Sequence, residues 1–250
     1  DTLSLHDALP ISRDDGCAWS LAGGALAGLS VIDLSVRPQG AHETLVLAAQ
    51  VAGGGDGKPR VFRSLDGAQS FEALPAPLPD DLLALTFDAA PSDPATLYVS
   101  GRFGAPDYQA TLIRSLDGGK SWQPSQHIAH SGPRLEGNPR KKSGGEREQT
   151  VNNPVAIVDR TTGAIEFLYC VNYARCFSMR SVDDGLTWSA PTDIPASFEP
   201  FHSKYPWKVI ATGPGHGIQL KSGRLVVPIW LAFGGVGDHA PSASGTIYSD

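Results

Sequence analysis

Apolar and polar residues alternate over short stretches along most of this chain, with the period of a β-strand rather than of a helix. The stretches are 31–36, 44–49, 61–64, 82–87, 96–99, 111–115, 154–158, 164–170, 176–180, 207–211, 224–232 and 246–250. Loops rich in Gly, Pro, Asp and Ser separate them, and no segment keeps a helical period. The pattern predicts an all-β protein.

An eight-residue turn motif follows three of these strands. Residues 115–122 (SLDGGKSW) and 181–188 (SVDDGLTW) read S-x-D-x-G-x-x-W, and 64–71 (SLDGAQSF) is a weaker copy with Ala68 at the glycine position. The Asp carboxylate can accept backbone N–H groups two or three residues on, and the glycine supplies a positive φ. We expect the closing aromatic to pack back over the hairpin, and the aspartates to be structural rather than catalytic.

The spacing of the motif indicates the kind of repeat. The three copies begin 51 and 66 residues apart, and a similar strand at 246–250 arrives where a fourth copy would begin. Repeats of this length made of short strands are typical of β-propeller blades. The sequence therefore predicts a partial propeller of about four blades, truncated within the last one.

Composition agrees with a turn-rich β protein and limits its partners. The chain has 28 Gly, 20 Pro and only 18% charged residues, and its net charge of −6 gives no support for a nucleic-acid partner. Cys17, Cys170 and Cys176 lack metal-binding spacing, so neither a metal nor a cofactor is predicted. Cys170 and Cys176 could form a cross-strand disulfide or remain buried thiols. No apolar run is long enough to span a membrane, and no secretory signal peptide is visible.

The chain divides into four parts by composition. Residues 1–12 are expected to be a non-native leader, and 13–126 to form turn-motif propeller blades. Residues 127–149 are rich in Ser, Gly, Pro and charge, which predicts a surface loop or a junction between unrelated sequences. Residues 150–250 are expected to form further blades.

Residues 150–250 resemble the exo-α-sialidase (neuraminidase) family of Asp-box or BNR-repeat propellers. The resemblance rests on several motifs in order: NNP at 152–154, VDRTTG at 158–163, the turn motif at 181–188, GPGHGIQL at 213–220, GRLVVP at 223–228 and IYSD at 247–250. It implies a six-bladed propeller that releases terminal sialic acid from glycoconjugates with retention of configuration. It also favours a secreted or periplasmic location.

The same resemblance implies a set of catalytic groups. Sialidases use a Tyr nucleophile activated by Glu, because a neutral nucleophile avoids repulsion by the substrate carboxylate. Three arginines bind that carboxylate bidentately, and an Asp acts as general acid and then base. In this chain the resemblance implies Asp107 as the general acid/base, and Arg102, Asn153 and Trp230 as substrate-binding residues. A loop role for Asp107, a turn role for Asn153 and core packing for Trp230 are the structural alternatives.

The chain also departs from the family pattern. The family's first arginine lies in an R-I-P strand before the acid, where residues 81–85 (DLLAL) have none. The Tyr, its Glu and the other two arginines lie in the family beyond the position of Asp250. We therefore expect this polypeptide not to turn over substrate. His216 is expected to support the backbone, and Arg175 to be a strand or surface arginine.

Two other functions stay open. The first half, including the stretch 87–99, resembles the turn-motif propellers of the sortilin and photosystem-assembly type as much as it resembles a sialidase. The protein could therefore be a non-catalytic propeller that binds protein or glycan. A different glycosidase on a related propeller is the weakest reading, since no paired carboxylates stand at suggestive positions.

Overall fold

The computed structural model describes residues 10–12, 14–22, 24–37, 43–50, 58–90, 93–103, 110–129, 151–213, 215–233 and 241–249. Strands dominate these residues, and helical structure is confined to α1 (Glu199–His202) and the 3-10 turns η1 (Gly24–Leu26) and η2 (Pro195–Ser197). None of the described helices has the length and apolarity needed to cross a bilayer. The predicted all-β class is confirmed.

Four antiparallel sheets follow one another along the chain, and we call them blades 1 to 4. Blade 1 contains β3 (Leu29–Arg37), β4 (Glu43–Gln50), β5 (Pro59–Ser64) and β6 (Glu72–Ala73). Blade 2 contains β7 (Leu82–Ala89), β8 (Leu97–Phe103), β9 (Ala110–Ser115) and β10 (Gln126–Ala129). Blade 3 contains β11 (Val151–Val158), β12 (Ile165–Val171), β13 (Arg175–Ser181) and β14 (Thr192–Asp193).

Blade 4 has an interrupted first strand. Both β15 (Val209–Thr212) and β16 (Ile218–Gln219) pair with one side of β17 (Leu225–Ala232), and β18 (Ser242–Tyr248) pairs with the other side. The intervening residues 213–217 belong to the GPGHGIQL segment. A separate two-stranded sheet joins β1 (Pro10–Ile11) to β2 (Ser20–Leu21), so the end of the expected leader is paired with the chain that follows it.

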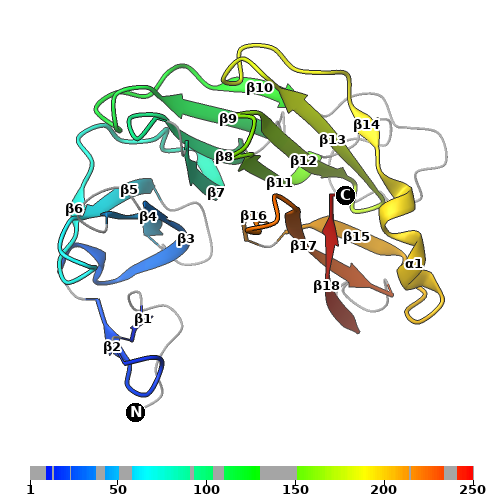
Figure 1. Ribbon diagram of the computed structural model, residues 1–250, viewed down its shortest axis with the longest axis horizontal. Helices are drawn as coiled ribbons and strands as arrows, with labels where there is room; N and C mark the ends of the chain where they lie inside the picture. The colour runs from blue at the N-terminus through cyan, green and yellow to red at the C-terminus, as the bar shows by residue number, and fades with distance from the viewer. Residues whose placement is uncertain are drawn as a thin grey trace.

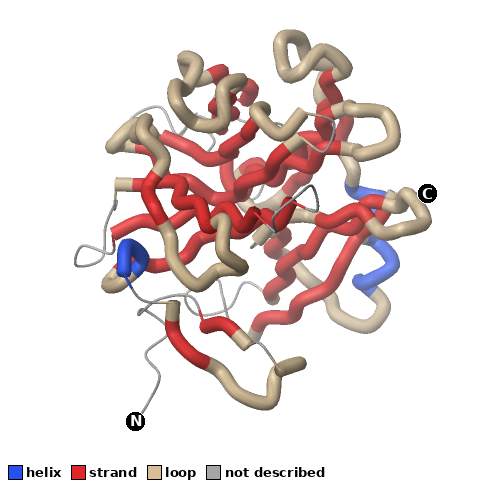
Figure 2. Tube along the Cα trace, turned by 60° about the vertical axis from the view of Figure 1, so that its left-hand side comes forward, coloured by secondary structure: helices blue, strands red, loops and turns tan. Residues whose placement is uncertain are grey.

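The blades form an arc in which the first strand of each lies innermost (Figure 1). Contacts run from β3 to β7, from β7 to β11 and from β11 to β15. Figure 2, seen from another side, shows that strands make up most of the described chain and that helices are few and short. The predicted propeller arrangement of about four blades is therefore confirmed.

Hydrophobic cores lie between consecutive blades. Along β12, Phe167 and Tyr169 face a core shared with blade 2, whereas Leu168 and Cys170 face a core shared with blade 4. Because successive side chains of a strand point to opposite faces, a strand buried on both faces is apolar throughout. The core between blades 2 and 3 contains residues from both sides of segment 130–150, so these two parts of the chain pack together.

The turn motifs have the predicted local structure. Ser115 and Ser181 each accept the backbone N–H four residues on, at 2.8 and 2.9 Å, and each donates to the motif aspartate at 2.8 Å. Hydrogen bonds to the carboxylates, chiefly from the hydroxyl of the seventh motif residue, lower the pKa of Asp117 and Asp183 to about 2. The glycine position has a φ of 81° in Gly185. These aspartates are therefore fully committed to the turns.

The closing aromatic does more than the sequence suggested. The indole Nε1–H of Trp122 donates to the carbonyl of Ala76, in the connection between β6 and β7, at 3.0 Å. The backbone N–H of Ala76 in turn donates to the carbonyl of Gly119, at 3.3 Å. The motif of blade 2 thus binds the connection that leads from blade 1 into blade 2, in addition to closing its own hairpin.

Residues 127–129 differ from the expected loop. They belong to β10, which pairs with β9 through His127 opposite Thr111. The rest of the predicted loop, residues 130–149, lies outside the described residues.

Candidate functional site

The order of the strands gives the propeller two ends. In each blade the third strand runs parallel to the first, so the turn motifs lie where the first strands finish. We call this the motif end. The first strands start, and the second strands finish, at the other end, which we call the far end.

The described site residues predicted from the sequence meet at the far end. Arg102 lies near the end of β8, Asn153 near the start of β11, and Trp230 near the end of β17. They come from three consecutive blades. Asp107 belongs to the connection between β8 and β9 and lies outside the described residues.

Arg102 is held by a hydrogen bond across the interface between blades 2 and 3. Its Nη1–H donates to the side-chain oxygen of buried Asn152 at 3.0 Å. Arg102 also pairs across the sheet with Leu83, in the segment where the family pattern has its first arginine. A Cβ on neighbouring Gly101 would lie 2.5 Å from the carbonyl oxygen of Leu83, so only glycine permits this approach. The guanidinium of Arg102 is therefore fixed next to the segment in which the family has its first arginine and this chain has none.

Asn153 forms part of a bulge at the start of β11. Its φ of 52° lies in the left-handed region, which Asn tolerates better than most residues. Its carbonyl accepts the Thr212 hydroxyl of blade 4 at 2.6 Å, and its side-chain oxygen lies 3.9 Å from the Cys170 sulfur. The residue thus has the turn conformation named as its structural alternative, at the end that carries Arg102.

Trp230 packs against an aromatic residue that sequence reasoning missed. The rings of Trp230 and Tyr173 lie edge to face, with centroids 6.3 Å apart. Tyr173 sits in the connection between β12 and β13, and burial raises the pKa of its hydroxyl. A short polar break between two apolar strands is the signal that could have identified this turn.

Blade 3 also contains Cys170, Cys176 and Arg175. Cys170 and Cys176 pair directly across β12 and β13 and are both free thiols. Burial raises the pKa of Cys170 to about 12, so this thiol is unreactive. Arg175 bonds to Asp193 at 2.8 Å, as expected of a strand arginine.

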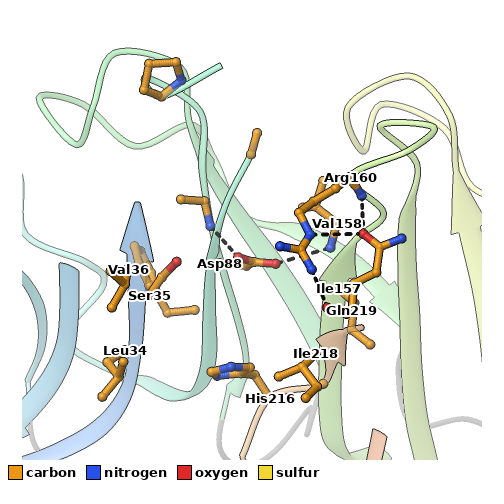
Figure 3. A pocket seen from close by; sticks show the side chains of 15 residues that line it. Leu34, Ser35, Val36, Asp88, Ile157, Val158, Arg160, His216, Ile218 and Gln219 are labelled. Atoms are coloured by element: carbon orange, nitrogen blue, oxygen red, sulfur yellow. Dashed lines mark hydrogen bonds between the residues drawn. The ribbon is translucent and has the colours of Figure 1, made fainter. Parts of the chain in front are cut away.

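A second group of polar residues lies at the motif end, around a pocket of about 380 Å³ (Figure 3). The wall comes from β3, β7, β11 and the segment 216–219, and its polar members are Ser35, Asp88, Arg160, His216 and Gln219. The described residues contain no group of three or more His, Cys, Asp or Glu side chains placed to bind a metal.

His216 joins blade 4 to blade 1 beside this pocket. Its Nδ1 bonds to the Asp33 carboxylate, whose second oxygen accepts the backbone N–H of Phe87 at 2.8 Å. The Asp33 hydrogen bond raises the pKa of His216. Asp88 accepts the N–H groups of Ala89 and Val158, and burial raises the pKa of its carboxyl. His216 therefore makes a side-chain link between blades, rather than only supporting its own backbone.

Comparison with protein families and curated proteins gives consistent results. The BNR repeat-like domain family matches residues 100–243, which is more than half of the chain. The chain is 37% identical over 81 residues to sialidase-4 of Mus musculus, a match that covers 30% of this chain and 16% of that protein. The chain therefore spans only a small part of this curated relative.

Solved structures show the same fold at low sequence identity. The K499G mutant of NanB sialidase from Streptococcus pneumoniae superposes with a TM-score of 0.51 and 12% identity, covering 88% of this chain and 32% of that one. An ulvan lyase of polysaccharide lyase family PL25 gives the same TM-score and identity, covering 91% of this chain and 57% of that one. These likenesses concern the architecture alone.

Proposed function

Since the chain belongs to the BNR repeat-like domain family, in the sialidase type of propeller, we propose that it is part of an exo-α-sialidase. The enzyme would be a retaining glycoside hydrolase that releases terminal sialic acid from glycoconjugates. The observation that carries the proposal is the meeting of Arg102, Asn153 and Trp230 at one end of three consecutive blades.

Each residue has a role that suits its chemistry. Arg102 offers a planar guanidinium to the substrate carboxylate, from the position beside Leu83. Trp230 and Tyr173 offer aromatic faces and edges to the apolar side of the sugar. Asn153 offers an amide to the acyl-amino or glycerol arm. Asp107 is proposed to act as general acid and then base.

The polypeptide 1–250 is proposed to bind sialosides without turning them over. The start of β7 carries Leu82 and Leu83 in the segment where the family has its first arginine. The same leucines favour a second candidate, a propeller that binds glycans without catalysis.

The test measures binding of 3′-sialyllactose to the polypeptide by saturation-transfer NMR, with lactose as the uncharged comparison. We expect saturation on the sialic acid protons and little on lactose. The variants Trp230→Ala and Arg102→Gln should reduce the sialic acid signal at least fivefold. Trp19→Ala and Arg224→Gln remove exposed residues of the same types elsewhere and should leave it unchanged.

Three results would decide against parts of the proposal. Equal binding of lactose would favour the glycan-binding alternative, because recognition would not depend on the acidic sugar. No binding of either ligand would contradict a sialoside site at the far end. Hydrolysis of a fluorogenic sialoside, abolished by Asp107→Asn, would confirm the sialidase activity but refute the absence of turnover.

A further inference from the structure

The pocket at the motif end has no role in the proposed sialidase site, which lies at the other end of the propeller. Its polar groups come from all four blades, with Asp88 of β7 contributed by blade 2. Ser35 belongs to β3, Arg160 follows β11, and His216 precedes β16. Figure 3 shows Ser35 and Arg160 on opposite sides of the opening, with His216 below them and Asp88 between.

The acidic groups around the pocket are committed to the protein. One Asp33 oxygen accepts the N–H of Leu34 at 2.8 Å and also meets His216, and the other accepts a backbone N–H of β7. Both Asp88 oxygens accept backbone N–H groups, at 2.8 and 3.3 Å. Backbone N–H groups therefore hold both carboxylates in place.

The donors, in contrast, are only partly used. Arg160 gives Nε–H and Nη2–H to Gln219, and within the described part of the chain its Nη1 meets no acceptor. His216 uses Nδ1 for Asp33, and its Nε2 has no partner among the residues that the structure describes. Figure 3 shows the Arg160 guanidinium directed from the top of β11 into the opening. The Ser35 hydroxyl adds a third donor without a partner among the described residues.

The rest of the wall is apolar. It contains Leu34, Val36, Phe87, Ile157 and Ile218, and of these Val36 and Ile218 are at least half exposed. A volume of about 380 Å³ lies within the usual range of small-molecule sites. Concave apolar walls with a few convergent polar groups are the common composition of such sites.

We propose that this pocket binds a small organic anion, namely a carboxylate with an apolar body, whose charged group meets Arg160 and His216. A guanidinium suits a planar carboxylate, and an imidazolium Nε2–H gives a second charge-assisted hydrogen bond. The apolar body of the ligand lies against the side chains of β3 and β16. The proposal goes beyond the sialidase function and does not depend on it.

The test uses phenylacetate, with phenylacetamide as the neutral analogue of the same shape, in calorimetric titrations of the polypeptide. We expect a dissociation constant on the order of 1 mM for phenylacetate, as suits a ligand of this size. The amide should bind at least tenfold more weakly. Arg160→Gln should weaken phenylacetate binding at least fivefold, while Arg224→Gln, at the same end but over the Tyr248 ring, should not change it.

An NMR readout keeps the test independent of the variants. The ring signals of His216 should shift on titration with phenylacetate, whereas those of His202, on α1, should not. Equal affinity for the acid and the amide would overturn the proposal. The absence of binding at phenylacetate concentrations up to about 10 mM would overturn it as well. Loss of sialyllactose binding at the far end would leave this result unaffected, so the two proposals fail separately.

Discussion

The link between His216 and Asp33 should govern how stability depends on pH above neutrality. Asp33 is 7% exposed and also accepts the N–H of Phe87, which is itself buried. Asp33→Ala removes both of these interactions, together with the hydrogen bond from the Leu34 N–H. It leaves the imidazole of His216 and a buried backbone N–H without their acceptor.

The size of the effect follows from these two losses. A buried backbone N–H without a partner costs about 1–3 kcal/mol, and removing one member of a buried ion pair costs about 3–5 kcal/mol. The His216 side chain is 31% exposed, so solvent screens part of the pair and the lower end applies. We expect Asp33→Ala to lower the free energy of unfolding by about 3–4 kcal/mol.

The sign of the pH dependence follows from the raised pKa of His216. The Asp33 hydrogen bond favours the protonated ring in the folded state, with Asp33 and Asp88 as the charged neighbours. A raised folded pKa gives stability that is complete below the unfolded value of about 6.5 and is lost as pH rises through the folded pKa. The motif aspartates titrate far below this range, because their pKa values are lowered.

The assay is urea unfolding followed by tryptophan fluorescence at pH 6 and pH 8.5. The unchanged protein should be less stable at pH 8.5, and this difference should shrink in His216→Gln. His202→Gln removes an exposed imidazole from α1 and serves as the matched control. An equal pH dependence in the unchanged protein and in His216→Gln would refute the reasoning.

Three further substitutions test the backbone and the turns by the same urea assay. Gly101→Ala should destabilise by about 1–3 kcal/mol or prevent folding, because its Cβ would lie 2.5 Å from the Leu83 carbonyl oxygen; stability within 0.5 kcal/mol would contradict this close approach. Ala68→Gly should stabilise by about 0.5–1 kcal/mol, since Ala68 has a φ of 64°; no gain would indicate that this turn is unstrained. Ser181→Ala should cost about 1–3 kcal/mol by leaving the buried Gly185 N–H unpaired, and an unchanged midpoint would show that water replaces the hydroxyl.

The strands and repeats were predictable because their signals are local. Alternation over four to eight residues and a fixed turn motif identify hairpins without knowledge of the rest of the fold. Ala68 stands where the other motifs have glycine, and it keeps the same left-handed conformation. The repeat spacing then predicts blades, since a single hairpin cannot bury its own apolar faces.

The contacts between blades were less predictable, because they join residues far apart in the sequence. Nothing local marks Trp122 as a donor to Ala76, 46 residues earlier. The link from His216 to Asp33 spans 183 residues. Its histidine lies in the GPGHGIQL segment, which was identified only by its resemblance to the sialidase family. Tyr173 lies in no family motif for the same reason, whereas the roles proposed for Arg102, Asn153 and Trp230 rest on family motifs.

The pattern of contacts between blades makes the His216–Asp33 link more important for stability than a single hydrogen bond would suggest. Each blade packs mainly on its neighbours in the sequence, so stability along the arc is close to a sum of nearest-neighbour terms. Such a chain can lose an end blade without losing the others. His216 and Asp33 connect the fourth blade to the first, so they couple blades that share no core. Weakening this pair should therefore reduce the cooperativity of unfolding as well as its free energy.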